Sequence, residues 1–324
     1  MTNAKALLGI TVIALGACQS GPEGASNADL NLPPVSEDVI TRHVATLASD
    51  AFEGRAPGTP GGLKTREYLV TEMRRLGLEP IGDSYELPVT MVSRETLPAQ
   101  SAARFDYGGV ADDLAYRSEA VFWSARDAQR ISIRDSEVVF VGHGVVAPEY
   151  GWDDYAGLDV SGKTVVMLIN DPGFRLEGDD FAGRAMTYYG RYTYKFEEAA
   201  RQGAEAAIIV HQTAPAAYPW GVVEGGWTGP QLDLPRAEGA VQPVKVGGWI
   251  TLEQARELFT AAGMNFEEME ERATRKGFEP VDMGNVTFSA ELVQELAISE
   301  SANVAGVLPG TERPDEYVLY TAHW

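Results

Sequence analysis

Histidine is the side chain in this 324-residue sequence best suited to bind a transition metal or to move a proton at neutral pH, and it occurs four times. A zinc site formed by one short segment needs at least two such ligands close together. Positions 43, 143, 211 and 323 are too far apart for that, so each histidine is judged by its own surroundings. We expect structural roles for His43, beside the apolar face of a helix, for His143, in a glycine turn, and for His211, at the end of a buried strand.

His323 has a different setting, because it follows the strand-like run "EYVLYTA", from Glu316 to Ala322. In α/β enzymes, ligands bind in a crevice outside the carboxyl ends of the sheet strands. The position therefore indicates a metal ligand or a base in such a crevice. It also predicts that the domain continues beyond Trp324, since enzymes of this kind extend past this strand.

Other familiar catalytic motifs are missing or stand in the wrong context. The sequence has no G-x-S-x-G nucleophile elbow and no H-E-x-x-H zinc helix. The stretch "GHGVVA", from Gly142 to Ala147, fits a dinucleotide-binding pattern, but Pro148 stands where the phosphate-binding helix should begin. The sequence thus favours neither serine-hydrolase nor nucleotide-dependent chemistry.

The single cysteine, Cys18, follows a cationic start and a short apolar run from Ala6 to Ala17. This run has the length of a signal-peptide core and is shorter than the ~20 residues that span a bilayer. The segment "LGAC" that ends at Cys18 resembles the bacterial lipobox. The resemblance implies that residues 1–17 are removed and that acylated Cys18 anchors an exported protein in the cell envelope, at the periplasm or outer membrane. The alternative is an ordinary signal peptide with a chance cysteine.

Composition limits the partners. The formal net charge of −21 disfavours nucleic acid and anionic lipid as binding partners, because such surfaces need clustered Lys and Arg. A hydrophobic content of 44% is typical of a globular protein, and the length allows about two domains. A lone cysteine also excludes an intrachain disulfide framework.

The elements that must position these residues begin after a flexible, Gly/Pro/Ser-rich tether at residues 18–35. Ser36 is typical of a helix N-cap, and a second helix ends at Gly77. The chain then changes to strands. One helix is predicted at "YTYKFEEAARQGA". A second is predicted to begin at Thr251, where Thr-x-x-Gln forms a capping box, and a third covers residues 266–276. Strands are predicted at residues 138–141, 165–169 and 206–210, and at "NVTFSAELV", "NVAGVLPG" and "EYVLYTAH".

Three separated blocks resemble the M28 family of zinc-dependent exopeptidases, the aminopeptidase group. The first is "SDAFEGRAPGTPGG" with the following "YLVTEMRRLGLEP". The second, "APEYGWDDYAGLDVSGKTVVMLINDPGF" with "YGRYTYKFEEAARQGAEAAIIVHQTAPAAYPWG", resembles the protease-associated (PA) domain inserted in many members. The third, "ESANVAGVLPGTERPDEYVLYTAHW", is similar to the strand pair leading to the first metal-binding segment. The blocks occur in the family's order and cover nearly all of residues 36–324.

The resemblance implies an α/β fold in which a mixed-sheet zinc-exopeptidase domain, of the phosphorylase/hydrolase-like type, is interrupted by a β-rich α+β PA domain. The implied boundaries are 36–93 for the first part of the peptidase domain, 96–292 for the PA domain and 298–324 for the start of the metal-binding part.

The resemblance also implies two zinc ions as cofactors, because the histidine of the family's "AH" segment is a zinc ligand and corresponds to His323. The family's remaining ligands and its glutamate base would follow Trp324, so no catalytic residue is expected within this chain. A single imidazole binds zinc weakly. We therefore expect a cell-envelope peptidase that acts on peptide or protein substrates as an aminopeptidase, and expect this chain alone to be inactive.

Other functions stay open at this point. A lipid-anchored, non-catalytic module would use the PA domain to bind a ligand or partner. A cyclase acting on N-terminal glutamine shares the fold, but such relatives usually lack the PA domain. The sequence leaves the preferred substrate side chain, exo or endo cleavage and the oligomeric state open.

The lipobox predicts that Cys18 is acylated. Cells labelled with a fatty-acid analogue should incorporate label into the wild-type protein and not into Cys18→Ser, because the thiol is the acceptor. Equal labelling of the two proteins would show that the lipoprotein interpretation is wrong.

Overall fold

The structure is a computed structural model that describes residues 34–176 and 180–324. The expected signal peptide (residues 1–17) and Cys18 lie outside the described residues, as does most of the tether. Within the described part of the chain, no helix is both long enough and apolar enough to cross a membrane.

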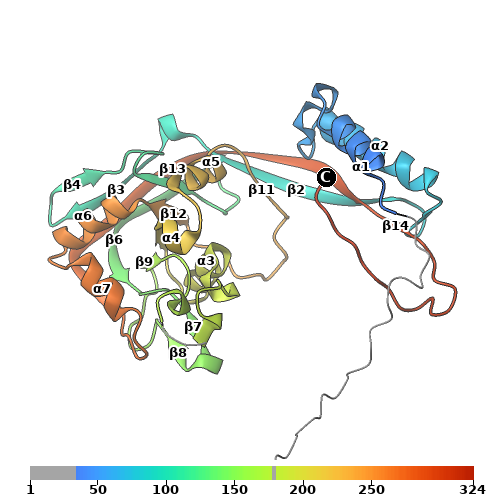
Figure 1. Cartoon of the computed structure of the whole chain (residues 1–324). Helices are drawn as coiled ribbons and strands as arrows, with labels where there is room; N and C mark the ends of the chain where they lie inside the picture. Colours follow the sequence, from blue (N-terminus) through green and yellow to red (C-terminus); the bar gives the residue numbers. More distant parts are fainter. Residues whose placement is uncertain (1–33, 177–179) are drawn as a thin grey trace, which may run out of the picture.

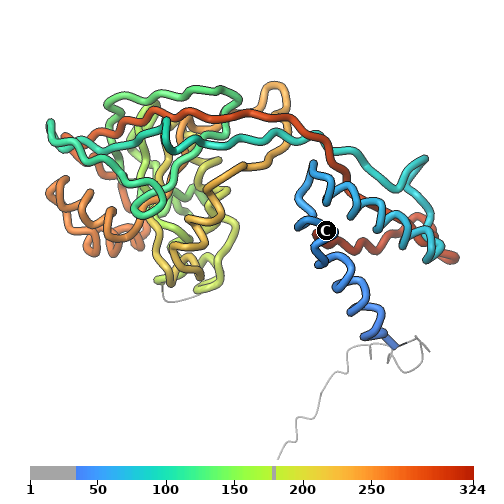
Figure 2. The backbone as a smooth tube through the Cα atoms, turned by 90° about the horizontal axis from the view of Figure 1, so that it is seen from above, coloured from blue at the N-terminus to red at the C-terminus, as the bar shows by residue number. Residues whose placement is uncertain are grey.

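The described chain has three parts (Figure 1, Figure 2). A compact unit, residues 97–293, contains all three clusters of buried apolar side chains found among the described residues. A helical end consists of residues 34–85 and 305–324. A two-stranded ribbon, residues 86–96 paired antiparallel with 294–304, joins the other two parts.

The compact unit is built on a ten-stranded sheet that continues into the ribbon. The main strand order is β11-β2-β13-β6-β9-β10-β12-β5, with β3 and β4 attached beside β13. Strands β6, β9, β10 and β12 are parallel, and their neighbours pair antiparallel. The predicted α/β class with a mixed sheet is confirmed. The strands are β2 Glu86–Thr96, β3 Ala102–Tyr107, β4 Ala111–Asp113, β5 Ala120–Trp123, β6 Arg130–Phe140, β9 Thr164–Leu168, β10 Ala206–Val210, β11 Gln231–Asp233, β12 Val246–Ile250 and β13 Val281–Val304.

Helices cover both faces of the parallel strands. One face packs against α6 (Leu252–Ala261) and α7 (Phe266–Arg272), and the other against α3 (Tyr192–Arg201) and α5 (Trp220–Trp227). Every residue of β9, β10 and β12 is therefore buried, which explains why these strands read as unbroken apolar runs. Besides several 3-10 turns, the compact unit also contains the short elements α4 Thr213–Ala216, β7 Val146–Ala147 and β8 Trp152–Asp153.

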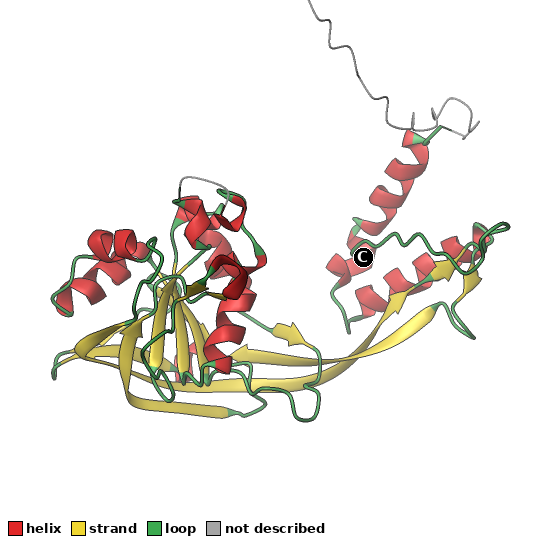
Figure 3. Cartoon of the chain, turned by 90° about the horizontal axis from the view of Figure 1, so that it is seen from below, coloured by secondary structure: helices red, strands yellow, loops and turns green. Residues whose placement is uncertain are grey.

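The helical end contains α1 (Glu37–Leu47) and α2 (Pro60–Arg75), with the strand pair β1 (Glu79–Pro80) and β14 (Gly306–Val307). Its helix boundaries agree with the sequence. Ser36 Oγ accepts a hydrogen bond from Val39 N at 3.3 Å, and Gly77 follows α2 with a φ of +74°. Figure 3 shows α1 pointing away from the sheet. Its apolar face is uncovered, with Ile40 51% and Val44 61% exposed.

Three predicted elements differ from the structure. The predicted strand "EYVLYTAH", residues 316–323, is not a strand, because no neighbouring strand pairs with it in the described chain, and Tyr317 to Tyr320 are 78–92% exposed. The helix predicted over 266–276 ends at Arg272, where the chain turns toward buried Phe278. The strand predicted at "NVAGVLPG" is not one strand: its first two residues end β13, which also contains "NVTFSAELV", and Gly306–Val307 form β14.

The uneven burial along β13 predicts an uneven response to truncation. Phe288 is fully buried, with its ring centroid 5.4 Å from that of Phe105 and 6.0 Å from that of Phe122, whereas Ile298 is 75% exposed. We expect Phe288→Ala to lower the free energy of unfolding by about 3–5 kcal/mol. The matched control Ile298→Ala should lower it by less than about 0.5 kcal/mol. Urea unfolding followed by tryptophan fluorescence measures both, and equal losses would contradict this account of the core.

Candidate functional site

His323 is exposed and lies in an irregular segment of the helical end. Among the described residues, no group of three or more His, Cys, Asp or Glu side chains is close enough to hold a metal ion. A zinc ion needs about four filled positions, several of them from the protein. The described residues therefore do not fit a zinc site, and His323 is at most one ligand of such a site.

The other three histidines have protein partners. His43 Nδ1 lies 2.6 Å from the Tyr68 hydroxyl, between α1 and α2. His211 Nε2 lies 3.0 Å from the carbonyl oxygen of Tyr218, and burial lowers the pKa of the His211 ring. His143 Nδ1 lies 3.2 Å from the carbonyl oxygen of Asn170.

A buried polar cluster lies where β6 and β9 end. It comprises His143, Asp154, Asn170, Asp171 and Lys195, which are at most 2% exposed. Carboxyl ends of neighbouring parallel strands meet at one edge of a sheet, which is why these loops come together. The turn after β6 needs positive φ on both sides of His143, and glycine supplies it at little cost, with φ +55° and +63°.

Asp154 organises the turn around His143. Its Oδ2 accepts hydrogen bonds from the backbone N–H of His143 at 3.1 Å and of Val145 at 3.0 Å. Its Oδ1 accepts one from Trp152 Nε1 at 2.7 Å. Lys195 reaches in from α3 and donates to the carbonyl oxygen of His143. One carboxylate and one ammonium thus bind three backbone polar groups of the turn, and backbone hydrogen bonds satisfy others.

Asp171 holds the loop after β9 in a similar way, by accepting hydrogen bonds from its backbone and from one of its side chains. Its carboxylate accepts hydrogen bonds from Gly173 N at 3.1 Å, from Thr187 N at 2.9 Å and from Thr187 Oγ1 at 2.6 Å. Asn170 has a left-handed φ of +70°, and its Nδ2 donates to the carbonyl oxygen of Pro215 at 2.8 Å. The cluster therefore ties three loops together.

Burial dominates the proton affinities in this cluster. It lowers the pKa of His143 to about 3, and the charge of Lys195 acts in the same direction. It raises the pKa of Asp154 to about 7, against the opposing effect of the N–H donors and Lys195. It lowers the pKa of Lys195 to about 7, against the attraction of Asp154 and Asp171. Such values suit proton transfer, but the side chains are closed off from solvent, so the arrangement chiefly holds the loops in place.

The sequence did not single out Asp154 or Lys195. The surroundings of Asp154, "GWDDY", look like an ordinary loop, and Lys195 lies in an amphipathic helix with other charged residues. One signal was available: Lys195 and Ala199 are four residues apart, so they share a helix face, and that face is the buried one.

The outer face of the sheet carries an open hollow of about 350 Å³ between β3, β4, β6 and β13. No histidine or cysteine is among its lining residues. Five charged side chains line it: Arg104, Asp113, Arg134, Asp135 and Glu291. Arg134 is 83% exposed and lies 3.4 Å from Glu291. Mixed exposed charges of this kind can bind a polar or zwitterionic molecule, and they offer no nucleophile activated by an imidazole.

The comparisons with known proteins leave the family open. No family model matches the chain, and no curated protein matches it. Among solved structures, an aminopeptidase from Aneurinibacillus sp. strain AM-1 aligns with a TM-score of 0.39 and 16% identity, over 86% of this chain and 52% of that one. The chain thus spans about half the length of that aminopeptidase. A similarity this low carries no conclusion about function. The M28 resemblance stays a hypothesis.

The low pKa of His143 predicts an acid-dependent loss of stability. In the unfolded chain this histidine takes up a proton below pH 6.5, whereas in the folded chain it stays neutral down to about pH 3. The unfolded state therefore binds more protons in this window, and stability falls as the pH falls. Between pH 6.5 and 5, wild type should lose about 1.6 kcal/mol more than His143→Asn. Urea unfolding at several pH values measures this, and parallel pH profiles would contradict it.

Proposed function

We propose that this chain is part of a zinc-dependent peptidase of the M28 type, which removes N-terminal residues from peptides and is attached to the cell envelope through Cys18. Three sequence blocks support the proposal, because each resembles a separate part of the family and they occur in the family's order. The substrate class and the two zinc ions of the complete enzyme come from that resemblance alone.

One structural observation supports the proposal most directly: two sequence blocks that are far apart in the chain lie together in the structure. β1 pairs with β14, although more than two hundred residues separate them in the chain. A Cβ atom at Gly58 would lie 3.0 Å from the Ser299 hydroxyl, so the loop before α2 rests directly on β13. Such contacts are expected if residues 36–93 and 298–324 belong to one domain and residues 96–292 are inserted in it.

His323 is the residue of this chain that would contribute to the metal site. No described group of three or more His, Cys, Asp or Glu side chains could hold a metal ion, so under this proposal the remaining ligands come from further sequence of the same protein. No catalytic step is derived from the described residues. Their role would be to present His323 and to carry the inserted domain.

A second candidate function is a lipid-anchored binding module without catalysis. The hollow on the outer face of the compact unit favours it, since its charged side chains are accessible without any rearrangement. The two functions differ in whether zinc-dependent turnover occurs in the full-length protein.

The peptidase proposal predicts zinc-dependent hydrolysis of aminoacyl fluorogenic substrates by a chain extended through the downstream reading frame, and none by residues 1–324 alone. In the extended chain, His323→Ala should lower turnover at least about 100-fold, since loss of a metal ligand removes the ion that activates water. The matched control His43→Asn should keep it, because His43 contacts only the α1–α2 interface. Zinc-dependent turnover by the short chain, or full activity of extended His323→Ala, would overturn the proposal.

A further inference from the structure

At the junction where the ribbon leaves the compact unit, the flanking strand changes. Inside the unit β6 pairs with β13, and just beyond it β11 pairs with β2. On one side, the pairing of β13 with β6 ends at Val293 and Arg130. On the other side, β11 pairs with residues 92–94 of β2, which lie opposite residues 296–298 of β13. β11 thus continues as a third strand beside the ribbon just beyond the point where β6 has ended.

β11 belongs to a strap, residues 228–245, that connects α5 to β12 and reaches across to the ribbon (Figure 1). Apolar packing does not hold the middle of the strap, because Leu232, Leu234 and Val241 are 48–61% exposed. Its attachment is polar. Arg236 donates to the carbonyl oxygens of Ala125 and Val241, both at 3.4 Å.

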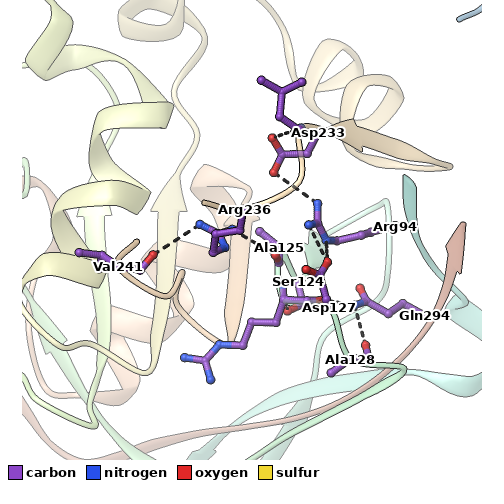
Figure 4. Close-up of polar contacts among 11 residues, drawn as sticks. Arg94, Ser124, Ala125, Asp127, Ala128, Asp233, Arg236, Val241 and Gln294 are labelled. Carbon is purple, nitrogen blue, oxygen red and sulfur yellow. Dashed lines mark hydrogen bonds and ion pairs between the residues drawn. The ribbon is translucent and has the colours of Figure 1, made fainter. Parts of the chain in front are cut away.

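Arg94 of β2 joins the strap to the rest of the junction (Figure 4). Its side chain is 3% exposed. Nε and Nη2 donate to Asp127 Oδ1 at 3.0 and 2.7 Å, and Nη1 donates to Asp233 Oδ2 at 3.3 Å. Asp127 lies in the loop between β5 and β6, and Asp233 lies in the strap. The planar guanidinium can hold both carboxylates at once because its N–H donors point in different directions.

Gln294 fastens the same loop to the other strand of the ribbon. Its Nε2 donates to the carbonyl oxygens of Arg126 and Ala128, both at 2.7 Å, and Figure 4 shows it beside Asp127. Arg126 in turn donates from Nε to the carbonyl oxygen of Pro243, at the far end of the strap, at 3.0 Å. The loop is therefore held by both ribbon strands and by the strap.

We propose that Arg94 and the strap form a latch that stiffens the ribbon and thereby sets the position of the helical end, which carries His323, relative to the compact unit. With the latch closed, three strands cross the junction. With the strap released, two strands remain, and a two-stranded ribbon twists and bends more readily than a wider sheet. The proposal concerns geometry and does not depend on the proposed peptidase activity.

The first measurement is hydrogen exchange of the strap in the full chain. Asp233→Ala removes the strap's link to Arg94 and leaves the Asp127 link intact, while Arg94→Met removes both. The Leu234 amide is left out of the comparison, because it donates to Asp233 Oδ1 at 2.8 Å and loses this bond in Asp233→Ala. Amides of residues 229–240 should exchange about tenfold faster in both variants, because a charge-assisted hydrogen bond no longer holds β11 on β2. Glu238→Ala is the matched control, since this strap carboxylate makes no contact with Arg94. Unchanged exchange in Asp233→Ala would overturn the role of Arg94.

The second measurement follows the helical end directly. Spin labels at Glu67→Cys on α2 and Glu257→Cys on α6, both exposed, report the distance across the ribbon in a Cys18→Ser background. The distance distribution should be narrow with the latch intact and clearly broader in Asp233→Ala and Arg94→Met. A pair within the compact unit, Arg134→Cys with Glu257→Cys, should keep its width in every variant, which shows that the unit remains folded.

The two measurements separate the parts of the proposal. Faster strap exchange together with a broadened distance confirms the latch. Faster exchange with an unchanged distance would show that the strap does not stiffen the ribbon, and the proposal would be wrong. Neither result depends on zinc or on turnover, so a failure of the peptidase proposal would leave this test unaffected.

Discussion

The register of β13 is the constraint on which the rest of the described structure depends. This strand, Val281–Val304, pairs with β6 and β3 over its first half and with β2 over its second half. Side chains alternate between the faces of a sheet, so a slip of one residue would turn Phe288 out of the core. The same slip would move Ser299 away from Gly58 and the loop before α2. One register therefore determines both the core of the compact unit and the attachment of the helical end.

At the carboxyl ends of the parallel strands, buried side chains fill the position where a ligand crevice could lie. Ligands of α/β proteins commonly bind at the carboxyl ends of parallel strands, yet here Asp154 and Lys195 fill that position and satisfy the backbone of the turn between them. Burying these charges costs free energy that their mutual attraction only partly offsets. In exchange for this cost, the hydrogen bonds fix the loop conformation. The accessible hollow lies elsewhere, on the outer face of the sheet.

Local signals explain which parts of the fold the sequence predicted. A helix cap depends on one residue and its neighbours, so Ser36, Gly77 and the capping box at Thr251 were recognisable, and Thr251 Oγ1 does accept a hydrogen bond from Gln254 N at 3.2 Å. Buried parallel strands were recognisable because both of their faces are apolar. The mixed sheet and the α/β class were implied by the resemblance, and the sheet of the compact unit agrees with them.

The predictions that failed depend on partners distant in sequence. "EYVLYTAH" has the composition of a strand, but a strand also needs a neighbour, and the described chain provides none. The buried polar cluster combines residues from three loops and a helix, and none of its spacings is periodic. The assignment of His323 as a zinc ligand stays a prediction, because a metal site needs ligands from several segments and no described group of three or more His, Cys, Asp or Glu side chains could hold a metal ion.

Stability should decline along β13 from the compact unit toward the helical end. Phe288 has paired strands on both sides and aromatic rings packed on it, whereas residues near Val304 have one paired neighbour. At the far end, α1 is an 11-residue helix without a buried residue, and an isolated helix shorter than about 12–15 residues is marginal in water. The free energy of local opening is lowest where buried contacts are fewest. α1 therefore depends on its contacts with α2, such as the hydrogen bond between His43 and Tyr68, and the ribbon joins this end of the chain to the compact unit.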